Sequence, residues 1–266
     1  MLYRGDKRAA LAWARRWLGL GDAPAPARQV PAPAPRSTAA DPDVAARRAA
    51  ALRLFLAAQP RLAGTPAASY LAARGIDLAE LGRQPRSLRF HPGLWNRESG
   101  RDWPALVAAV VSRAGEHVAT HRTWLAQDRD GIWRKAPLRE PKMSLGRTAG
   151  ATIRLWRGAS GKPLRDAPEG DTVAIAEGIE TALSVAIACP ELRVLCAVSL
   201  GNLQRIALPP AVRTVILCAD DDGDNERARA AFDWAVQHFL ADGRSVRIAR
   251  PPIGKDFNDT LQAAAA

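Results

Sequence analysis

From residue 172 onward, short apolar runs alternate with helical stretches, and this alternation constrains the fold more than any other feature. The four apolar runs are TVAIA at 172–176, RVLCAV at 193–198, TVILCA at 214–219 and SVRIAR at 245–250. Helices are expected at about 179–188 and about 225–241, with Gly243 ending the second. Short apolar strands alternating with helices predict an α/β fold whose parallel sheet is covered on both faces.

Acidic residues follow three of these runs directly. Glu177 follows the first run, Asp220 and Asp222 follow the third, and GKDFND at 254–259 comes after the fourth. The carboxyl ends of parallel strands meet at one edge of a sheet, where ligands bind. Crowded carboxylates repel one another, and a divalent cation with hard oxygen ligands relieves that repulsion. The sequence therefore predicts a metal and catalytic site of Glu177, Asp220 and Asp222 for Mg²⁺ or Mn²⁺, with a solvated turn that caps a helix as the alternative.

Other acidic residues near the three clusters are secondary candidates, namely Glu180, Asp224, Asp256 and Asp259. Glu180 and Asp224 are either outer ligands or charges that complement a helix terminus. Asp221 is expected to be exposed, because an extended chain points it away from its two neighbours.

Two other motifs compete for ILCADDDG at 216–223. A phosphatase of the haloacid dehalogenase type would use Asp220 as its nucleophile. That motif belongs on the first strand of its fold, however, and it leaves Glu177 without a role. An EF-hand starting at Asp220 would need glycine at 225 and an acidic residue at 231, where this chain has Asn225 and Ala231.

Charge is unevenly distributed along the chain. Residues 1–165 contain 29 Lys and Arg against 12 Asp and Glu, residues 166–266 contain 9 against 15, and the net charge is +11. A GC-rich genome explains part of the arginine excess but not the asymmetry. A basic part joined to an acidic, metal-competent part indicates a polyanion that one part holds and the other processes.

The first 165 residues divide into three regions. Residues 1–22 contain an amphipathic helix, residues 23–41 form a Pro/Ala linker, and residues 42–165 form a basic α+β lobe. Two helices are expected early in this lobe, at 43–58 and 66–74. Strands and turns follow them.

The cysteines and the apolar segments indicate a reduced, membrane-free setting. Cys189, Cys196 and Cys218 lie in apolar runs and form no CxxC pair, so reduced core residues are expected and zinc is not. No run approaches eighteen apolar residues and the start does not resemble a secretory signal, which predicts a cytoplasmic protein with no membrane partner.

The motifs AEGIETALSV at 176–185, CADDDGDN at 218–225 and GKDFND at 254–259 together resemble the Toprim domain. This metal-binding fold is shared by bacterial-type primases, topoisomerases and some nucleases. Its pattern is Glu-Gly after the first strand, Asp-x-Asp after the third and a later acidic motif after the fourth. The resemblance implies a four-stranded, mostly parallel sheet flanked by helices, in a Toprim domain at 166–266.

The preceding lobe resembles mobile-element and phage primase-like proteins. The segments that carry this resemblance are GTPAASYLAARGI at 64–76, LRFHPGLW at 88–95, PALVAAVVSR at 104–113 and the stretch 121–146. The resemblance implies synthesis of short RNA primers on single-stranded DNA from nucleoside triphosphates, with a separate replicative helicase as a partner. The candidate contacts to phosphate or template are Arg122, Lys135, Lys142 and Lys255.

Two alternatives to a primase stay open: a Toprim nuclease that hydrolyses phosphodiesters, and a non-catalytic DNA-binding accessory protein. A topoisomerase is set aside because Tyr3 and Tyr70 are the only tyrosines, and both are distant in sequence from the acidic motifs. Relatives carry an N-terminal zinc module, whereas residues 8–20 here resemble only the helical tail of that module. We therefore expect a member that lost the module or that starts downstream of it.

Overall fold

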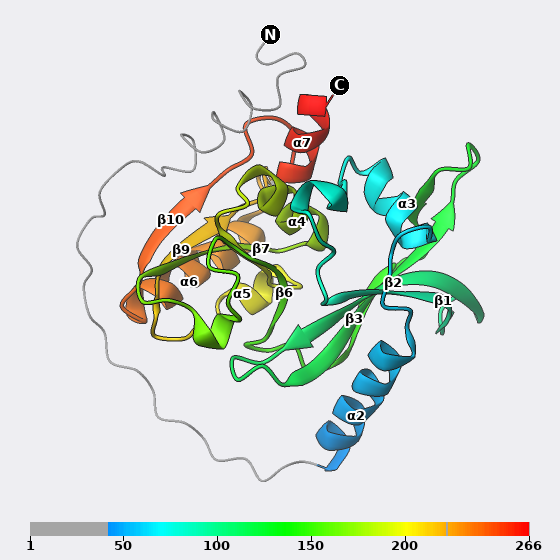
Figure 1. Cartoon of the computed structure of the whole chain (residues 1–266), viewed down its shortest axis with the longest axis horizontal. Coiled ribbons are helices and arrows are strands. Elements are labelled where there is room, and N and C mark those ends of the chain that lie inside the picture. Colours follow the sequence, from blue (N-terminus) through cyan, green and yellow to red (C-terminus); the bar gives the residue numbers. More distant parts are fainter. Residues whose placement is uncertain (1–41, 222, 266) are drawn as a thin grey trace. The chain divides into compact units, whose positions relative to one another are not determined.

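The computed structural model describes residues 42–221 and 223–265, which fold into two compact units (Figure 1). One unit, the hairpin unit, ends at Thr148, and the other, the parallel-sheet unit, begins at Ala149. The N-terminal helix and the Pro/Ala linker expected from the sequence lie outside the described residues.

The hairpin unit consists of two helices, a 3-10 helix and five strands. They are α2 (Pro42–Ala57), α3 (Pro66–Ala73), η1 (Leu78–Leu81), β1 (Leu88–Asn96), β2 (Arg101–Val111), β3 (His117–Gln127), β4 (Trp133–Lys135) and β5 (Lys142–Gly146). Strand β2 pairs antiparallel with β1 and with β3, and β3 also pairs antiparallel with β4 and β5.

Local sequence signals account for several features of this unit. Thr65 is the N-cap of α3 and its hydroxyl accepts a hydrogen bond from the Ala68 N–H. Gly115 turns the chain between β2 and β3 with φ of 91°, a conformation that favours glycine. Helix α2 packs on one face of the sheet, where the Thr120 hydroxyl donates to the carbonyl oxygen of Ala51 at 2.7 Å.

The parallel-sheet unit consists of five strands with helices between them. Its elements are β6 (Thr152–Arg157), η2 (Leu164–Asp166), β7 (Asp171–Ala176), α4 (Ile179–Ala188), β8 (Arg193–Cys196), α5 (Leu200–Leu203), β9 (Val212–Cys218), α6 (Glu226–Ala241), β10 (Ser245–Ala249) and α7 (Phe257–Ala265). The strands lie in the order β10-β9-β7-β8-β6. The first four are parallel to one another, and β6 is antiparallel to β8. This pairing places β6 in the second unit, so the division between the units falls before residue 166.

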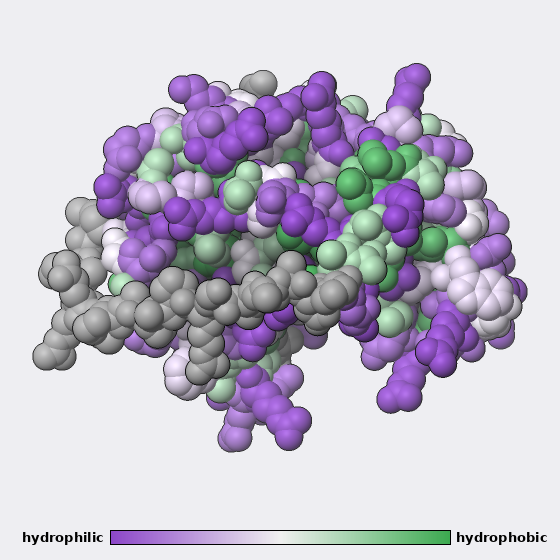
Figure 2. All heavy atoms as spheres, turned by 90° about the horizontal axis from the view of Figure 1, so that it is seen from below, coloured by the Kyte–Doolittle hydropathy of each residue, from purple (hydrophilic) through white to green (hydrophobic). Residues whose placement is uncertain are grey.

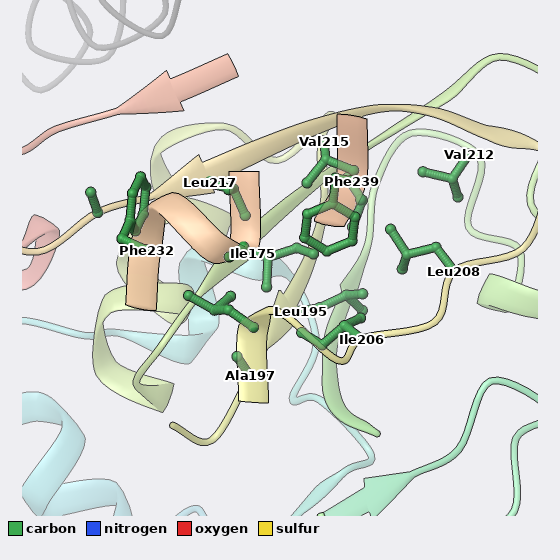
Figure 3. Packing of buried hydrophobic residues seen from close by; sticks show 14 of the residues in the cluster. Ile175, Leu195, Ala197, Ile206, Leu208, Val212, Val215, Leu217, Phe232 and Phe239 are labelled. Carbon is green, nitrogen blue, oxygen red and sulfur yellow. The ribbon is translucent and has the colours of Figure 1, made fainter. Parts of the chain in front are cut away.

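The sheet is covered by helices on both faces, as the strand–helix alternation predicts. On one face, buried side chains of β7, β8 and β9 pack against Phe232 and Phe239 of α6 (Figure 3). On the other face, α4 packs against the strands and contacts α7. Nearly every residue of α4 is buried, including the polar residues Glu180, Thr181 and Ser184. All three cysteines are buried and unbridged, as expected.

A buried ion pair holds the amino ends of β7 and β8 together. Arg193 Nε lies 2.7 Å from an Asp171 carboxylate oxygen, and the Arg193 side chain is only 2% exposed. The remaining guanidinium nitrogens donate to the carbonyl of Lys162 and the hydroxyl of Ser160. The guanidinium is thus well satisfied, which a buried charge requires.

Within residues 42–221 and 223–265, no helix is long and apolar enough to cross a membrane. Hydrophilic side chains cover most of the face drawn in Figure 2, and hydrophobic side chains gather there in smaller areas. Large exposed hydrophobic residues include Leu56 and Trp234. Residues of this kind are ordinary on a protein surface when they are scattered.

Helix α6 provides a matched test of the core. Phe239 is fully buried whereas Trp234 of the same helix is 65% exposed. We expect Phe239→Ala to lower the free energy of unfolding by about 3–5 kcal/mol, because it opens a cavity beneath α6. Trp234→Ala should change it by no more than about 0.5 kcal/mol. Urea unfolding of both variants measures the difference, and equal losses would contradict the assigned orientation of α6.

Candidate metal and phosphate site

The topological switch point of the sheet lies between β7 and β9. Strand β7 leads through α4 to β8 on one side, whereas β9 leads through α6 to β10 on the other. The two connections leave in opposite directions, and open α/β sheets bind ligands at such a point, beyond the carboxyl ends of the strands. The last pair of the β7–β9 ladder is Ala176 with Cys218. Glu177 and Asp220 follow these ends, so the structure brings these two predicted residues to one edge.

The turn after β7 presents Glu177 at the start of α4. Glu177 is half-buried, and its backbone carbonyl accepts a hydrogen bond from the Cys196 thiol at 3.1 Å. Gly178 is the N-cap of α4, and Glu180 lies in the first turn of that helix with 8% of its surface exposed. A carboxylate in the first turn complements the helix dipole.

The turn after β9 carries Asp220, Asp221, Asp222 and Asp224, which together form the acidic run. Asp220 is half-buried and its Oδ1 atom is shielded from solvent, whereas Asp221 is exposed as predicted. The thiol of Cys218, just before this run, has its pKa raised by burial, with smaller contributions from Cys189 and Asp220. Asp222, the third predicted ligand and catalytic residue, lies outside the described residues. The sequence prediction for Asp222 therefore stays a prediction.

The third acidic motif begins a helix that was not predicted from the sequence, α7. An Asp256 carboxylate oxygen accepts hydrogen bonds from the backbone N–H groups of Asn258 and Asp259, so Asp256 caps α7. The Asp259 carboxylate accepts from the Lys255 N–H at 2.9 Å. Both carboxylates thus hold the loop before α7 in shape. The Asp221 N–H donates to the carbonyl of Lys255 at 2.7 Å, which ties this loop to the acidic run after β9.

Two further candidates lie at the surface of the same unit. Asp224 is exposed and pairs with Arg229 of α6 at 3.0 Å, as a charge near a helix start does. Lys255 is also exposed, next to the acidic run that its carbonyl contacts.

The basic candidates of the hairpin unit do not share one face. Lys142 is opposite Thr123 of β3, and Lys135 is opposite Leu125, two residues further along the same strand. These two lysines therefore project from one face of the sheet. Arg122 projects from the other face, where its guanidinium lies 5.0 Å from the Trp124 ring centroid and burial lowers its pKa.

The donor set at the switch point suits a hard divalent cation. Glu177 and Asp220 offer carboxylate oxygens from adjacent strand ends, and the second of them is partly removed from water. A carboxylate oxygen in such a place is stabilised by a nearby positive charge. No cluster of three or more His, Cys, Asp or Glu that could hold a metal occurs among the described residues, which leave out Asp222. The two described carboxylates fit a site that the third would complete.

Backbone strain occurs at this same edge of the sheet. Val198, two residues beyond β8, has φ of 74°, the only positive φ of a non-glycine residue in the described chain. A β-branched residue in the left-handed region costs on the order of 1–3 kcal/mol, and such strain concentrates at functional sites. Sequence reasoning gave no signal for it.

Comparisons with known proteins agree with this geometry. Residues 172–266 match the Toprim domain, and residues 45–155 match a domain of unknown function, DUF7146. No curated protein matches the chain at a significant level.

Solved primase structures share the fold. The DnaG primase catalytic domain bound to ssDNA has a TM-score of 0.51 and 17% identity, over 84% of this chain and 79% of that one. A DNA primase domain from Pseudomonas aeruginosa has a TM-score of 0.51 and 16% identity, over 82% of this chain and 74% of that one. The zinc-binding and RNA polymerase domains of the Aquifex aeolicus primase have a TM-score of 0.52 and 14% identity, over 82% of this chain and 57% of that one. The chain thus has the fold of a primase catalytic core. What it shares with these structures is their fold, and its residues 172–266 match the Toprim domain.

Gly254 allows a test of the loop before α7. It has φ of 75°, and a Cβ there would lie 2.4 Å from the Asp259 Cβ; Gly243 has φ of 73° but nothing within 4 Å. Alanine at either position costs about 1–2 kcal/mol of backbone strain. We expect Gly254→Ala to destabilise more than Gly243→Ala, because it must also displace Asp259. Urea midpoints at unchanged m-value measure this, and equal midpoints would show that the loop yields freely.

Proposed function

We propose that this chain is a primase-type nucleotidyltransferase that makes short RNA primers on single-stranded DNA from nucleoside triphosphates. The observation that carries the proposal is the placement of Glu177 and Asp220 at the switch point of a Toprim sheet. The primase-core fold and the basic balance of residues 1–165 support it.

The carboxylates would hold the metal that this reaction needs. When bound, Mg²⁺ or Mn²⁺ neutralises charge on the transferring phosphate and orients the attacking oxygen. Asp220 and Asp222 are proposed as its direct or water-mediated ligands, and Glu177 as a third ligand or as a general acid/base. Glu180, Asp224, Asp256 and Asp259 are proposed to shape the helix starts and loops around the site, because the contacts found for the last three serve that purpose.

Three lysines are proposed to hold the polyanions, of which Lys142 and Lys255 are exposed and Lys135 is half-buried. Lys142 and Lys135 share one face of the hairpin sheet, which suits a strand of phosphates. One similar structure, the DnaG catalytic domain, is bound to ssDNA. Lys255, beside the acidic run, is proposed for the triphosphate. A direct phosphate contact by Arg122 has less support, because its guanidinium is partly buried against Trp124.

A nuclease and a non-catalytic DNA-binding protein are separated from a primase by two assays. Extension of labelled nucleoside triphosphates on unlabelled single-stranded DNA identifies a primase, and metal-dependent cleavage without triphosphates identifies a nuclease. A chain that binds DNA and does neither is the accessory protein. The same assays on a fusion with a zinc-binding module test whether that module is required.

The acidic residues give the sharpest mutational test. Glu177→Gln, Asp220→Asn and Asp222→Asn should each abolish primer synthesis while the melting temperature stays the same or rises, because each removes one charge from a self-repelling cluster. Asp224→Asn is the matched control on the same turn, and it should retain activity because Asp224 only pairs with Arg229. Primer yield and thermal melts decide. Retained activity with a loss of about 1 kcal/mol would instead indicate helix capping.

The two lysines on one face give a second test. Lys142→Ala and Lys135→Ala should each weaken single-stranded DNA binding and lower the slope of log affinity against log salt by about 0.7, one phosphate contact each. Lys162→Ala is the control, an exposed lysine of the other unit. Fluorescence anisotropy at several salt concentrations measures the slopes. Equal slopes for all three variants would remove the lysines from the proposed interface.

A further inference from the structure

A buried chain of hydrogen bonds fastens α7 to α4. Asn258 is fully buried, and its Nδ2 donates to the Ser184 hydroxyl oxygen at 3.1 Å. Ser184 is 2% exposed, and its hydroxyl donates in turn to the carbonyl of Glu180 at 3.0 Å. The Asn258 Oδ1 atom accepts from Gln262 at 3.1 Å. Both ends of the buried amide are therefore satisfied, which fixes its orientation.

A second set of contacts runs from α7 to the acidic run after β9. The Asp259 carboxylate accepts from the Lys255 N–H, and the Thr260 hydroxyl donates to the carbonyl of Ile253 at 2.9 Å. These two bonds attach the loop before α7 to the first turns of that helix. The Lys255 carbonyl then accepts from the Asp221 N–H. Helix α7 is thus linked through Lys255 to this acidic run.

The strands alone do not fix the acidic residues against one another. The β7–β9 ladder ends at Ala176 and Cys218, so Glu177 and Asp220 both lie beyond the last pair. Glu177 directly precedes Gly178, the N-cap of the helix that carries Ser184, and Asp220 directly precedes Asp221, whose N–H bonds to Lys255. The hydrogen bond between Asn258 and Ser184 connects α7 to α4, and the bond between Lys255 and Asp221 connects the loop before α7 to the acidic run. Together they link the segment after β7 to the segment after β9, in addition to the pairing of the two strands.

We propose that Asn258 and Ser184 are a positioning pair that sets Asp220 and its neighbours against Glu177 for binding a divalent cation. Neither side chain is assigned a contact with substrate or metal. The inference rests on the proposed function only in taking these carboxylates as cation ligands. Outer contacts that orient ligands change metal affinity by about 10- to 100-fold when they are removed.

The test is a titration of the full-length chain with Mn²⁺ alone, followed by electron paramagnetic resonance of the free ion. Asp222→Asn, which removes a predicted ligand, identifies the signal that belongs to this site. Asn258→Ala and Ser184→Ala should each weaken that binding about 10- to 100-fold. The double variant should bind Mn²⁺ about as well as the single variant of lower affinity, because both substitutions remove the same hydrogen bond. Ser184→Thr keeps the hydroxyl and should retain most of the affinity.

Asp171→Asn is the control for plain loss of stability. It breaks the ion pair with Arg193 at the opposite end of β7, so it should lower the melting temperature and leave Mn²⁺ affinity unchanged. A second readout is amide hydrogen exchange. The Asp221 N–H, which bonds to Lys255, should exchange faster in Asn258→Ala and at the wild-type rate in Asp171→Asn.

Three outcomes would overturn the inference: unchanged Mn²⁺ affinity in Ser184→Ala or Asn258→Ala, an equal loss in Asp171→Asn, or no Mn²⁺ binding by the wild type. If Asn258→Ala does not fold, Ser184→Ala removes the same bond from the α4 side and decides alone. A wild type that binds Mn²⁺ but makes no primers would refute the proposed function and leave the positioning pair standing.

Discussion

The parallel pairing of β7 with β9 is the constraint on which the rest of the parallel-sheet unit depends. It makes these two strands neighbours although α4, β8 and α5 separate them in sequence. Their outgoing connections diverge, and open α/β sheets bind ligands beyond the carboxyl ends of the strands at such a point. Two carboxylates placed one or two residues past those ends therefore lie at the same edge of the sheet.

A sheet edge gives proximity, but it does not give a fixed geometry. The ladder ends before the acidic residues begin, and the turns beyond it need support from elsewhere. In this unit the support comes from backbone and buried amide groups around α7. Polar side chains such as Asn258 and Ser184 are costly to bury unless they are satisfied, so a fully bonded pair there specifies one arrangement of α4 and α7. The other end of β7 is held separately, by Arg193 and Asp171.

The acidic edge could be predicted from the sequence because Glu177 and Asp220 directly follow apolar runs of strand length, and the period of a strand is a local property. Helix α7 was missed because its sequence gives only a short apolar stripe, and its stability depends on contacts with α4. The faces of Arg122 and Lys142 could not be predicted either, because strand register is not local and a slip of one residue exchanges the faces. The second unit begins at Ala149, before the expected boundary at 166, for the same reason, since β6 joins β8 by a non-local antiparallel pairing.

The dependence of the acidic run on α7 has a consequence for the order in which the protein loses its parts. A helix of nine residues is marginal alone and opens at a lower free energy than a sheet covered on both faces. Transient opening of α7 would release the Lys255 carbonyl from Asp221 while the strands stay paired. The site would then have a shorter lifetime than the fold that carries it. Under mild heat or limited proteolysis, a population would arise whose sheet still gives the circular dichroism signal of the folded protein. The acidic residues of that population would nevertheless have lost their arrangement.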